Sequence, residues 1–181
     1  MRSLKKMKNI RIILLGLTLM ISSVILAQRN SLSTSEYSNL KFDNVAIQDI
    51  INTNGATNAM QSLFNNTLVV EKGFNDAVEH WIKFSTNSIC IEFYNGVKNG
   101  SITTYDLANI DVQKNTSKLR VKNKQIKLGD SGATLSSFNS RSLPNEKIYT
   151  FGLSNFDSYA YIHVNKSSNK VTKIGYNGNL L

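Results

Sequence analysis

The chain has 181 residues, of which 41% are hydrophobic and 18% are charged, and this balance supports a packed core and excludes a wholly disordered chain. The length is enough for one ordinary domain or two very small ones. Lys and Arg outnumber Asp and Glu by 21 to 12, and the single cysteine, Cys90, excludes a disulfide within the chain.

The first residues have the pattern of a secretory signal peptide. A basic run without acids precedes a nearly continuous apolar stretch from Ile12 to Leu26, and the small residue Ala27 follows. The apolar stretch is short for a membrane span of about 20 residues. We therefore predict a signal peptide over residues 1–27 and export to the bacterial periplasm or the medium, with a retained membrane anchor as the alternative.

Removal of the signal peptide changes the charge argument. The formal net charge of the whole chain is +9, but five of the basic residues and none of the acids lie in residues 1–27. The remaining net charge of +4 does not indicate a nucleic-acid partner. No cysteine stands directly after the predicted cleavage site, so no lipid-modified N-terminal cysteine is expected. We expect a soluble product without a permanent membrane anchor.

Two similar stretches follow a polar segment, residues 28–39, which lacks apolar periodicity and predicts a flexible leader. Gly55 and Gly129 each precede a phenylalanine after eight intervening residues, Phe64 and Phe138. Each stretch predicts a short helix after a glycine turn, with its apolar residues on one buried face. Thr57 and Ser131 are the expected helix N-caps.

Each predicted helix is followed by three segments with strand patterns. They are residues 79–85, 88–95 and 101–112 in the first half, and 147–153, 159–165 and 170–176 in the second. Within 159–165, Ala160, Ile162 and Val164 share one face, which is typical of a strand with one side buried. The fold class predicted is α+β: two tandem units, 40–113 and 117–181, sharing one helix-covered antiparallel sheet.

The junction between the predicted units is basic. Lys118, Arg120 and Lys122 alternate with the apolar residues Leu119 and Val121. Alternating charges on a strand predict an edge or solvent-facing strand that is protected by charge. The pattern favours a solvated face over an anion-binding site, which stays the alternative.

The second unit also carries a recognisable series of positions within residues 124–176. An I-x-x-G opening precedes the short helix, an aromatic strand follows, and the last strand reads K-V-x-x-I. The matching residues are Ile126, Gly129, Leu135, Phe138, Tyr149, Phe151, Ile162, Val171 and Ile174. This series resembles the domain shared by the secreted beta-lactamase inhibitor protein and the small lipoprotein of the outer-membrane barrel-assembly machinery. The resemblance implies a helix on an antiparallel sheet that serves as a protein-binding scaffold, and it assigns no binding residue.

Candidates for catalysis or metal binding are few. His80 and His163 lie in different predicted strands without metal-ligand spacing, and Cys90 lies in a regular strand rather than at a strained turn. The hydrolase, calcium-loop and phosphate-loop motifs are absent from the sequence. We expect no catalytic residues, no metal and no cofactor. A small periplasmic hydrolase that uses Cys90, or a pair such as Glu79 and Glu92, is the alternative.

The best binding candidates lie on one predicted strand. Tyr159, Tyr161 and His163 alternate with the apolar side of that strand, and exposed tyrosines on a sheet suit protein recognition. Ordinary cross-strand pairing is the other interpretation. We expect a non-enzymatic module that binds another envelope or secreted protein through these residues, with the basic strand Lys118–Lys122 beside them. An immunity or inhibitor protein is the remaining hypothesis.

Overall fold

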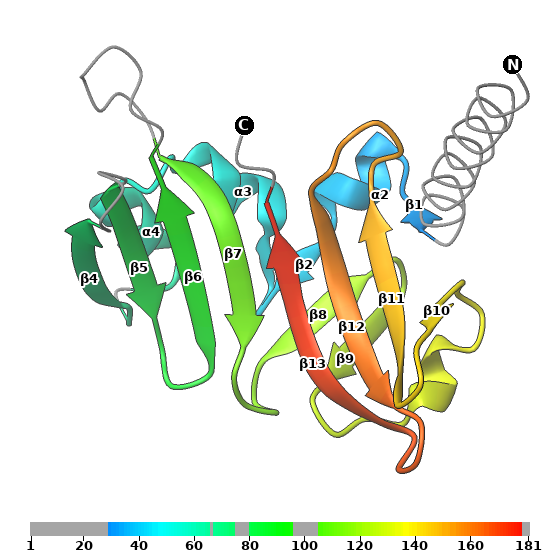
Figure 1. Ribbon diagram of the computed structural model, residues 1–181. Helices are drawn as coiled ribbons and strands as arrows, with labels where there is room; N and C mark the ends of the chain where they lie inside the picture. The colour runs from blue at the N-terminus through cyan, green and yellow to red at the C-terminus, as the bar shows by residue number, and fades with distance from the viewer. Residues whose placement is uncertain (1–28, 66, 75–79, 96–104, 179–181) are drawn as a thin grey trace, which may run out of the picture.

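The computed structural model describes residues 29–65, 67–74, 80–95 and 105–178 (Figure 1). The predicted signal peptide, residues 1–27, lies outside the described residues. The helices described are α2 (Thr34–Ser38), α3 (Ile47–Asn52), α4 (Thr57–Leu63) and the 3-10 helix η1 (Gly132–Leu135).

The described residues form a large sheet of nine strands in the order β1–β11–β12–β13–β7–β6–β5–β4, with β10 also paired to β11. The strands are β1 (Asn30–Ser31), β4 (Val69–Phe74), β5 (His80–Ser85), β6 (Ile89–Tyr94), β7 (Asp106–Val112), β10 (Arg141–Ser142), β11 (Glu146–Gly152), β12 (Tyr159–Asn165) and β13 (Lys170–Asn177). All pairs are antiparallel except β1–β11.

A small antiparallel sheet has the order β3–β2–β8–β9. It consists of two hairpins, β2 (Lys41–Phe42) with β3 (Val45–Ala46), and β8 (Lys118–Val121) with β9 (Lys124–Lys127). Asp43 and Asn44 in the first turn and Lys122 in the second have positive φ angles, as tight hairpin turns require.

The large sheet has two halves that meet at its centre. Strands β4–β7 form one meander and β11–β13 form the other, and their last strands, β7 and β13, pair antiparallel (Figure 1). Helices α3 and α4 lie behind the first half, and the small sheet lies behind the second. The face of the large sheet that points away from this second layer is called the open face below.

One hydrophobic core fills the space between the layers. It joins Ile82 and Phe93 of the first meander with Ile162 of the second and Leu119 of the small sheet, and all four are at most 2% exposed. The core residues of the described chain run from Leu32 to Tyr176. Residues 29–178 therefore supply every described strand and the whole described core.

The predicted fold class is confirmed, and the two halves share one sheet as expected. The structure adds that the first hairpin, β2–β3, pairs with β8 across the predicted boundary between the units. Part of residues 40–113 thus belongs to the layer behind the second half. That the two units arose as a repeat stays a prediction.

The prediction of a flexible leader over residues 28–39 is wrong for its described part. Ser33 caps α2 in a capping box with Glu36, and Leu32 and Tyr37 are buried. The hydroxyl groups of Tyr37 and Tyr176 lie 2.8 Å apart within hydrogen-bonding distance. Two buried residues are too few to give the segment an apolar period, although they fix it to the core.

The two predicted helices differ in the structure. Helix α4 begins at Thr57, but Ala56 occupies its N-cap position, so the predicted side-chain cap is wrong. The second helix is only η1, and Ser131 caps it by accepting a hydrogen bond from the Ala133 N–H. The glycine turns before both elements have positive φ angles at Gly55 and Gly129.

Of the two alternatives predicted for the junction, an edge strand or a solvent-facing strand, the edge strand is wrong. Strand β8 lies between β2 and β9 in the small sheet, and Leu119 and Val121 are fully buried. Lys118 and Arg120 are on the other side of the strand and half-buried. Alternation shows that one face of a strand is buried, but it does not show how many strands lie beside it.

Candidate functional site

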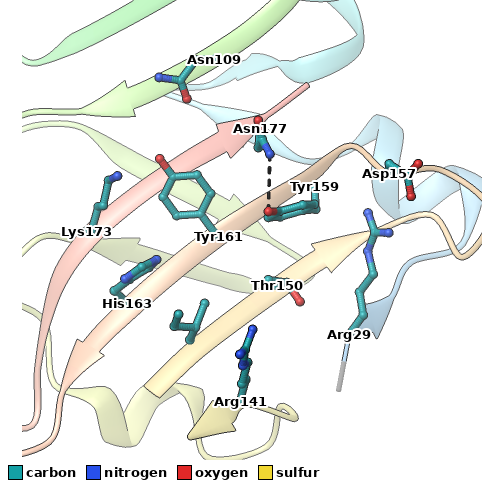
Figure 2. A pocket seen from close by; sticks show the side chains of 11 residues that line it. Arg29, Asn109, Arg141, Thr150, Asp157, Tyr159, Tyr161, His163, Lys173 and Asn177 are labelled. Carbon is teal, nitrogen blue, oxygen red and sulfur yellow. Dashed lines mark hydrogen bonds between the residues drawn. The ribbon is translucent and has the colours of Figure 1, made fainter. Parts of the chain in front are cut away.

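The candidate site is a hollow of about 610 Å³ on the open face of the second half (Figure 2). Strands β11, β12 and β13 form its floor, and β10 and the segment before β1 contribute from its border. Its lining residues are Arg29, Asn109, Arg141, Ile148, Thr150, Asp157, Tyr159, Tyr161, His163, Lys173 and Asn177. The three residues predicted from β12 are among them.

The alternation of β12 places these three side chains. Ala160 and Ile162 point into the core and are fully buried, so the residues between them face the hollow. Tyr159, Tyr161 and His163 form an aromatic row along the strand, with ring centroids 6.5 Å apart for the two tyrosines and 5.5 Å apart for Tyr161 and His163. The sequence prediction of their common face is confirmed.

Tyr161 is not the exposed residue that the sequence predicts. It is only 9% exposed, and its hydroxyl donates a hydrogen bond of 2.9 Å to Asp111 Oδ1 on β7. Gly175 of β13 lies between these two residues in the cross-strand row. A Cβ atom at Gly175 would lie 2.4 Å from the Tyr161 hydroxyl, so a glycine is needed for the ring to cross β13.

Asp111 thereby connects the two halves of the sheet. Its second carboxylate oxygen accepts a hydrogen bond of 2.8 Å from the side-chain amide of Asn109. Burial, followed by the hydrogen bond to Asp111, raises the pKa of Tyr161 well above its ordinary value. Tyr161 therefore stays protonated at neutral pH and serves as a fixed floor of the hollow rather than as an acid.

His163 is also held in place. Its Nδ1 lies 2.8 Å from Glu146 Oε2 on the neighbouring strand β11. Both side chains are only partly exposed. The carboxylate orients the imidazole ring beside Tyr161, so the aromatic row has few alternative conformations.

Positive charge surrounds the aromatic row. Lys173 Nζ lies 5.2 Å from the centre of the Tyr161 ring, and Arg29 Cζ lies 5.4 Å from the centre of the Tyr159 ring. Arg141 lies on β10, across β11 and β12 from Lys173 on β13 (Figure 2). Asp157 is the acid among the lining residues, so the lining has three permanent cations and one carboxylate. Such a site suits a ligand with carboxylates and a planar or apolar part.

The predicted basic residues Lys118, Arg120 and Lys122 are not part of this site. They belong to β8 and its turn in the small sheet, whose strands lie behind the large sheet (Figure 1). The core separates the two layers, so the basic strand does not lie beside the aromatic row as expected.

The structure does not bring the candidate catalytic residues together. Cys90 on β6 is opposite Ser85, five residues from His80 on the same strand β5, which corresponds to about 17 Å. Strands β7 and β13 separate β6 from His163 on β12, a distance of about 14 Å at the usual strand spacing. Glu79 lies outside the described residues.

The environment of Cys90 favours the thiol over the thiolate. The side chain is buried, and its sulfur lies 3.9 Å from Glu92 Oε1. Burial and then the charge of Glu92 raise the pKa of Cys90 to about 11. Within the described part of the chain, no group of three His, Cys, Asp or Glu residues is arranged to hold a metal ion.

The sequence analysis missed all three permanent cations of the hollow. Arg29 falls in the predicted leader, and Arg141 and Lys173 stand far from it in the sequence. Lys173 shares the face of Gly175 and Asn177, and alternation in β13 gives a signal for this face. No sequence pattern indicates that β10 folds back on β11.

No family model, no curated protein and no solved structure matches the chain. The resemblance of residues 124–176 to the inhibitor and lipoprotein domain therefore stays a prediction. None of the described helices is both long and apolar enough to cross a membrane.

Proposed function

We propose that this protein is a non-enzymatic binding module of the bacterial cell envelope that holds an acidic segment of another protein. The observation that carries the proposal is the hollow on the open face, where three cations surround an aromatic row of fixed geometry. Tyrosine and arginine are among the side chains most often responsible for affinity in protein interfaces. The hollow combines both in one concave surface.

Side chains that are already fixed favour binding because they lose little conformational entropy when a partner binds. Tyr161 is held by Asp111, and His163 is held by Glu146. Ordering a free side chain at an interface costs about 0.5–1.5 kcal/mol, so side chains that are already ordered reduce this cost. Lys173 and Arg141 are exposed and available to carboxylates of the partner.

The geometry gives a binding role more support than thiol catalysis. Cys90 lies outside the lining of the hollow, and its raised pKa disfavours the nucleophilic thiolate. Export of the chain rests on the N-terminal sequence pattern alone and is part of the proposal.

The test uses oligoglutamate as the probe and isothermal titration as the measurement. We expect oligoglutamate to bind the wild-type protein and oligoglutamine not to bind. The double variant Arg141→Gln/Lys173→Gln should lose binding at least tenfold, because two charge-assisted contacts are removed. The control variant Lys166→Gln/Lys170→Gln has the same net charge, and both of its changes lie at the exposed β12–β13 turn.

A second experiment tests whether the aromatic row contributes to binding. Tyr159→Ala should weaken binding while circular dichroism stays unchanged, because Tyr159 is only half-buried. The envelope protein that the wild type captures should be released by oligoglutamate. Binding that is equal in wild type, the hollow variant and the control variant would exclude the proposed function.

A further inference from the structure

A second charged surface lies on the outward face of the small sheet. Lys41 is opposite Arg120 in the β2–β8 pair, and Lys118 is opposite Lys127 in the β8–β9 pair. Leu119 and Ile126 alternate with these residues and are fully buried, so the four cations share the outward side. With Lys122 in the β8–β9 turn, they form what we call the basic face.

The cross-strand pairs of the basic face are unfavourable in the absence of an anion. Like charges directly opposite each other destabilise a sheet, and the basic face contains two such pairs. Among the described residues, the one ion pair of the basic face is formed by Glu36, whose Oε1 lies 3.3 Å from Lys122 Nζ. Lys41 and Arg120 have no carboxylate within ion-pair distance in the described part of the chain.

Two other acidic side chains lie nearby, but the carboxylate of each accepts a hydrogen bond from a main-chain N–H group. Asp43 accepts hydrogen bonds from the Lys118 N–H and the Ser117 hydroxyl. Asp130 accepts a hydrogen bond from the Lys127 N–H. Their oxygens fix turns, and an excess of positive charge remains on the basic face.

A notch of about 380 Å³ is lined by part of this surface. Lys41, Arg120 and Lys122 line it together with the polar side chains of α2 and the turn, which are Ser35, Glu36, Asn39 and Asn123. Lysine and arginine that converge with hydroxyl and amide donors are the usual partners of a phosphate group.

We infer that the basic face binds the surface of an anionic phospholipid bilayer, with a headgroup phosphate in the notch. A protein partner is disfavoured because stable protein interfaces need large aromatic or apolar anchors. The exposed large apolar residues of the described chain, Val69, Phe74 and Phe156, belong neither to the notch nor to the small sheet. Attraction of several basic residues to anionic headgroups needs no such anchor.

The inference goes beyond the proposed function and does not depend on it. The open face of the large sheet and the basic face are the two outward sides of the layered fold, with the core between them. A protein that lies on a bilayer through the basic face would still present the hollow to a partner.

The test is co-sedimentation with vesicles, using the chain that begins at Gln28. This chain contains every described strand and the described core, and it lacks the apolar segment that would insert by itself. We expect it to sediment with vesicles of equal parts phosphatidylglycerol and phosphatidylcholine, and to remain in solution with phosphatidylcholine alone. Added salt should weaken the binding because it screens exposed charges.

Charge variants locate the surface. Lys41→Gln/Lys118→Gln/Arg120→Gln should lower the vesicle partition coefficient about a hundredfold, because each basic residue near a membrane contributes a factor of about five. The control Lys114→Gln/Lys166→Gln/Lys170→Gln removes the same charge at exposed positions outside the basic face and should change it far less.

The substitution Glu36→Gln should change vesicle binding in the opposite direction. Removal of the one carboxylate in the notch should strengthen vesicle binding, and glutamine keeps the capping box of α2 possible. Inorganic phosphate, added at equal ionic strength, should not release the protein from sedimented vesicles, whereas an excess of fresh phosphatidylglycerol vesicles should. This comparison distinguishes binding to a bilayer from binding to free phosphate. The inference is overturned if the wild-type protein does not bind anionic vesicles, or if it binds duplex DNA in place of them. It is also overturned if the control variant loses as much affinity for the vesicles as the basic-face variant.

Discussion

The two halves of the open face are both antiparallel meanders, but their charged side chains are arranged differently. In the β4–β7 half, Glu71, Lys83 and Glu92 follow one another across neighbouring strands, and Lys83 Nζ lies 3.7 Å from Glu71 Oε2. In the β11–β13 half, Arg141 and Lys173 have no such partner among the described residues. In the first half the lysine lies between two carboxylates, whereas the second half leaves cations for a ligand.

The outer edges of the halves differ as well. Strand β11 is covered by β1 and β10, whereas β4 is the last strand of the described sheet on its side. Val69 and Phe74 of β4 are largely exposed. Among the described residues, the half with the hollow therefore has a covered outer edge and the other half does not, although both are antiparallel meanders.

The largest expected effect is at the joint between the halves. In Gly175→Val, the new Cβ would lie 2.4 Å from the Ile110 carbonyl oxygen and 2.4 Å from the Tyr161 hydroxyl. Because the obstacles are main chain and a buried ring, we expect a loss of roughly 3 kcal/mol in the free energy of unfolding. Urea unfolding measures it, and Thr172→Val, at an exposed position of the same strand, is the control.

A near-normal unfolding free energy for Gly175→Val would show that Tyr161 can leave its place at low cost. The hollow would then be less fixed than the comparison of the halves implies.

The next effect concerns the thiol of Cys90 in the β4–β7 half. With a pKa of about 11, Cys90 should react with Ellman's reagent at neutral pH about a hundredfold more slowly than an ordinary thiol, whose pKa is two units lower. The rate should rise as the pH approaches 11, because the thiolate fraction grows. Protein unfolded in urea is the control and should react at the ordinary rate.

The same raised pKa has a consequence for stability. Since the folded state disfavours the thiolate, the contribution of Cys90 is present below the ordinary thiol pKa and is lost as the pH rises toward 11. Cys90→Ala should therefore show a smaller alkaline loss of stability than wild type. A rapid reaction of the folded thiol at neutral pH would contradict both expectations.

A smaller effect is expected for the hydrogen bond between the halves. A double-mutant cycle of Tyr161→Phe and Asp111→Ala should give a coupling energy of about 2 kcal/mol, which is typical of a hydrogen bond to a charged group. Tyr159→Phe is the control, because its hydroxyl accepts only a long contact of 3.4 Å from Asn177. A coupling energy near zero would remove Asp111 as the link.

The sequence predicts the strands of both halves because alternation follows directly from the geometry of a strand. The face of Tyr159, Tyr161 and His163 was predictable for this reason. The burial of Tyr161 was not, because it depends on Gly175 and Asp111, which become neighbours only through pairing of strands from different halves.

The border of the hollow shows the same limit. Arg29 and Arg141 are distant in sequence, and their placement depends on β1 and β10 pairing with β11. Neither two-residue strand is long enough to show an apolar period. Local patterns predict the elements, whereas a site assembled from short, distant segments needs the pairing itself.

The smallest expected effect tests the charge balance of the first half. The ion pair between Glu71 and Lys83 is partly exposed, with side-chain exposures of 53% and 32%. Exposed pairs of this kind contribute about 0.2–1 kcal/mol, so a double-mutant cycle with alanine should give a value near the lower end. The carboxylates should matter more for binding than for stability: Glu71→Gln/Glu92→Gln removes both carboxylates opposite Lys83 and should give the first half a weak affinity for oligoglutamate. If this double variant leaves binding unchanged, the carboxylates beside Lys83 are not what distinguishes the halves, and the aromatic row of the second half would have to account for the difference.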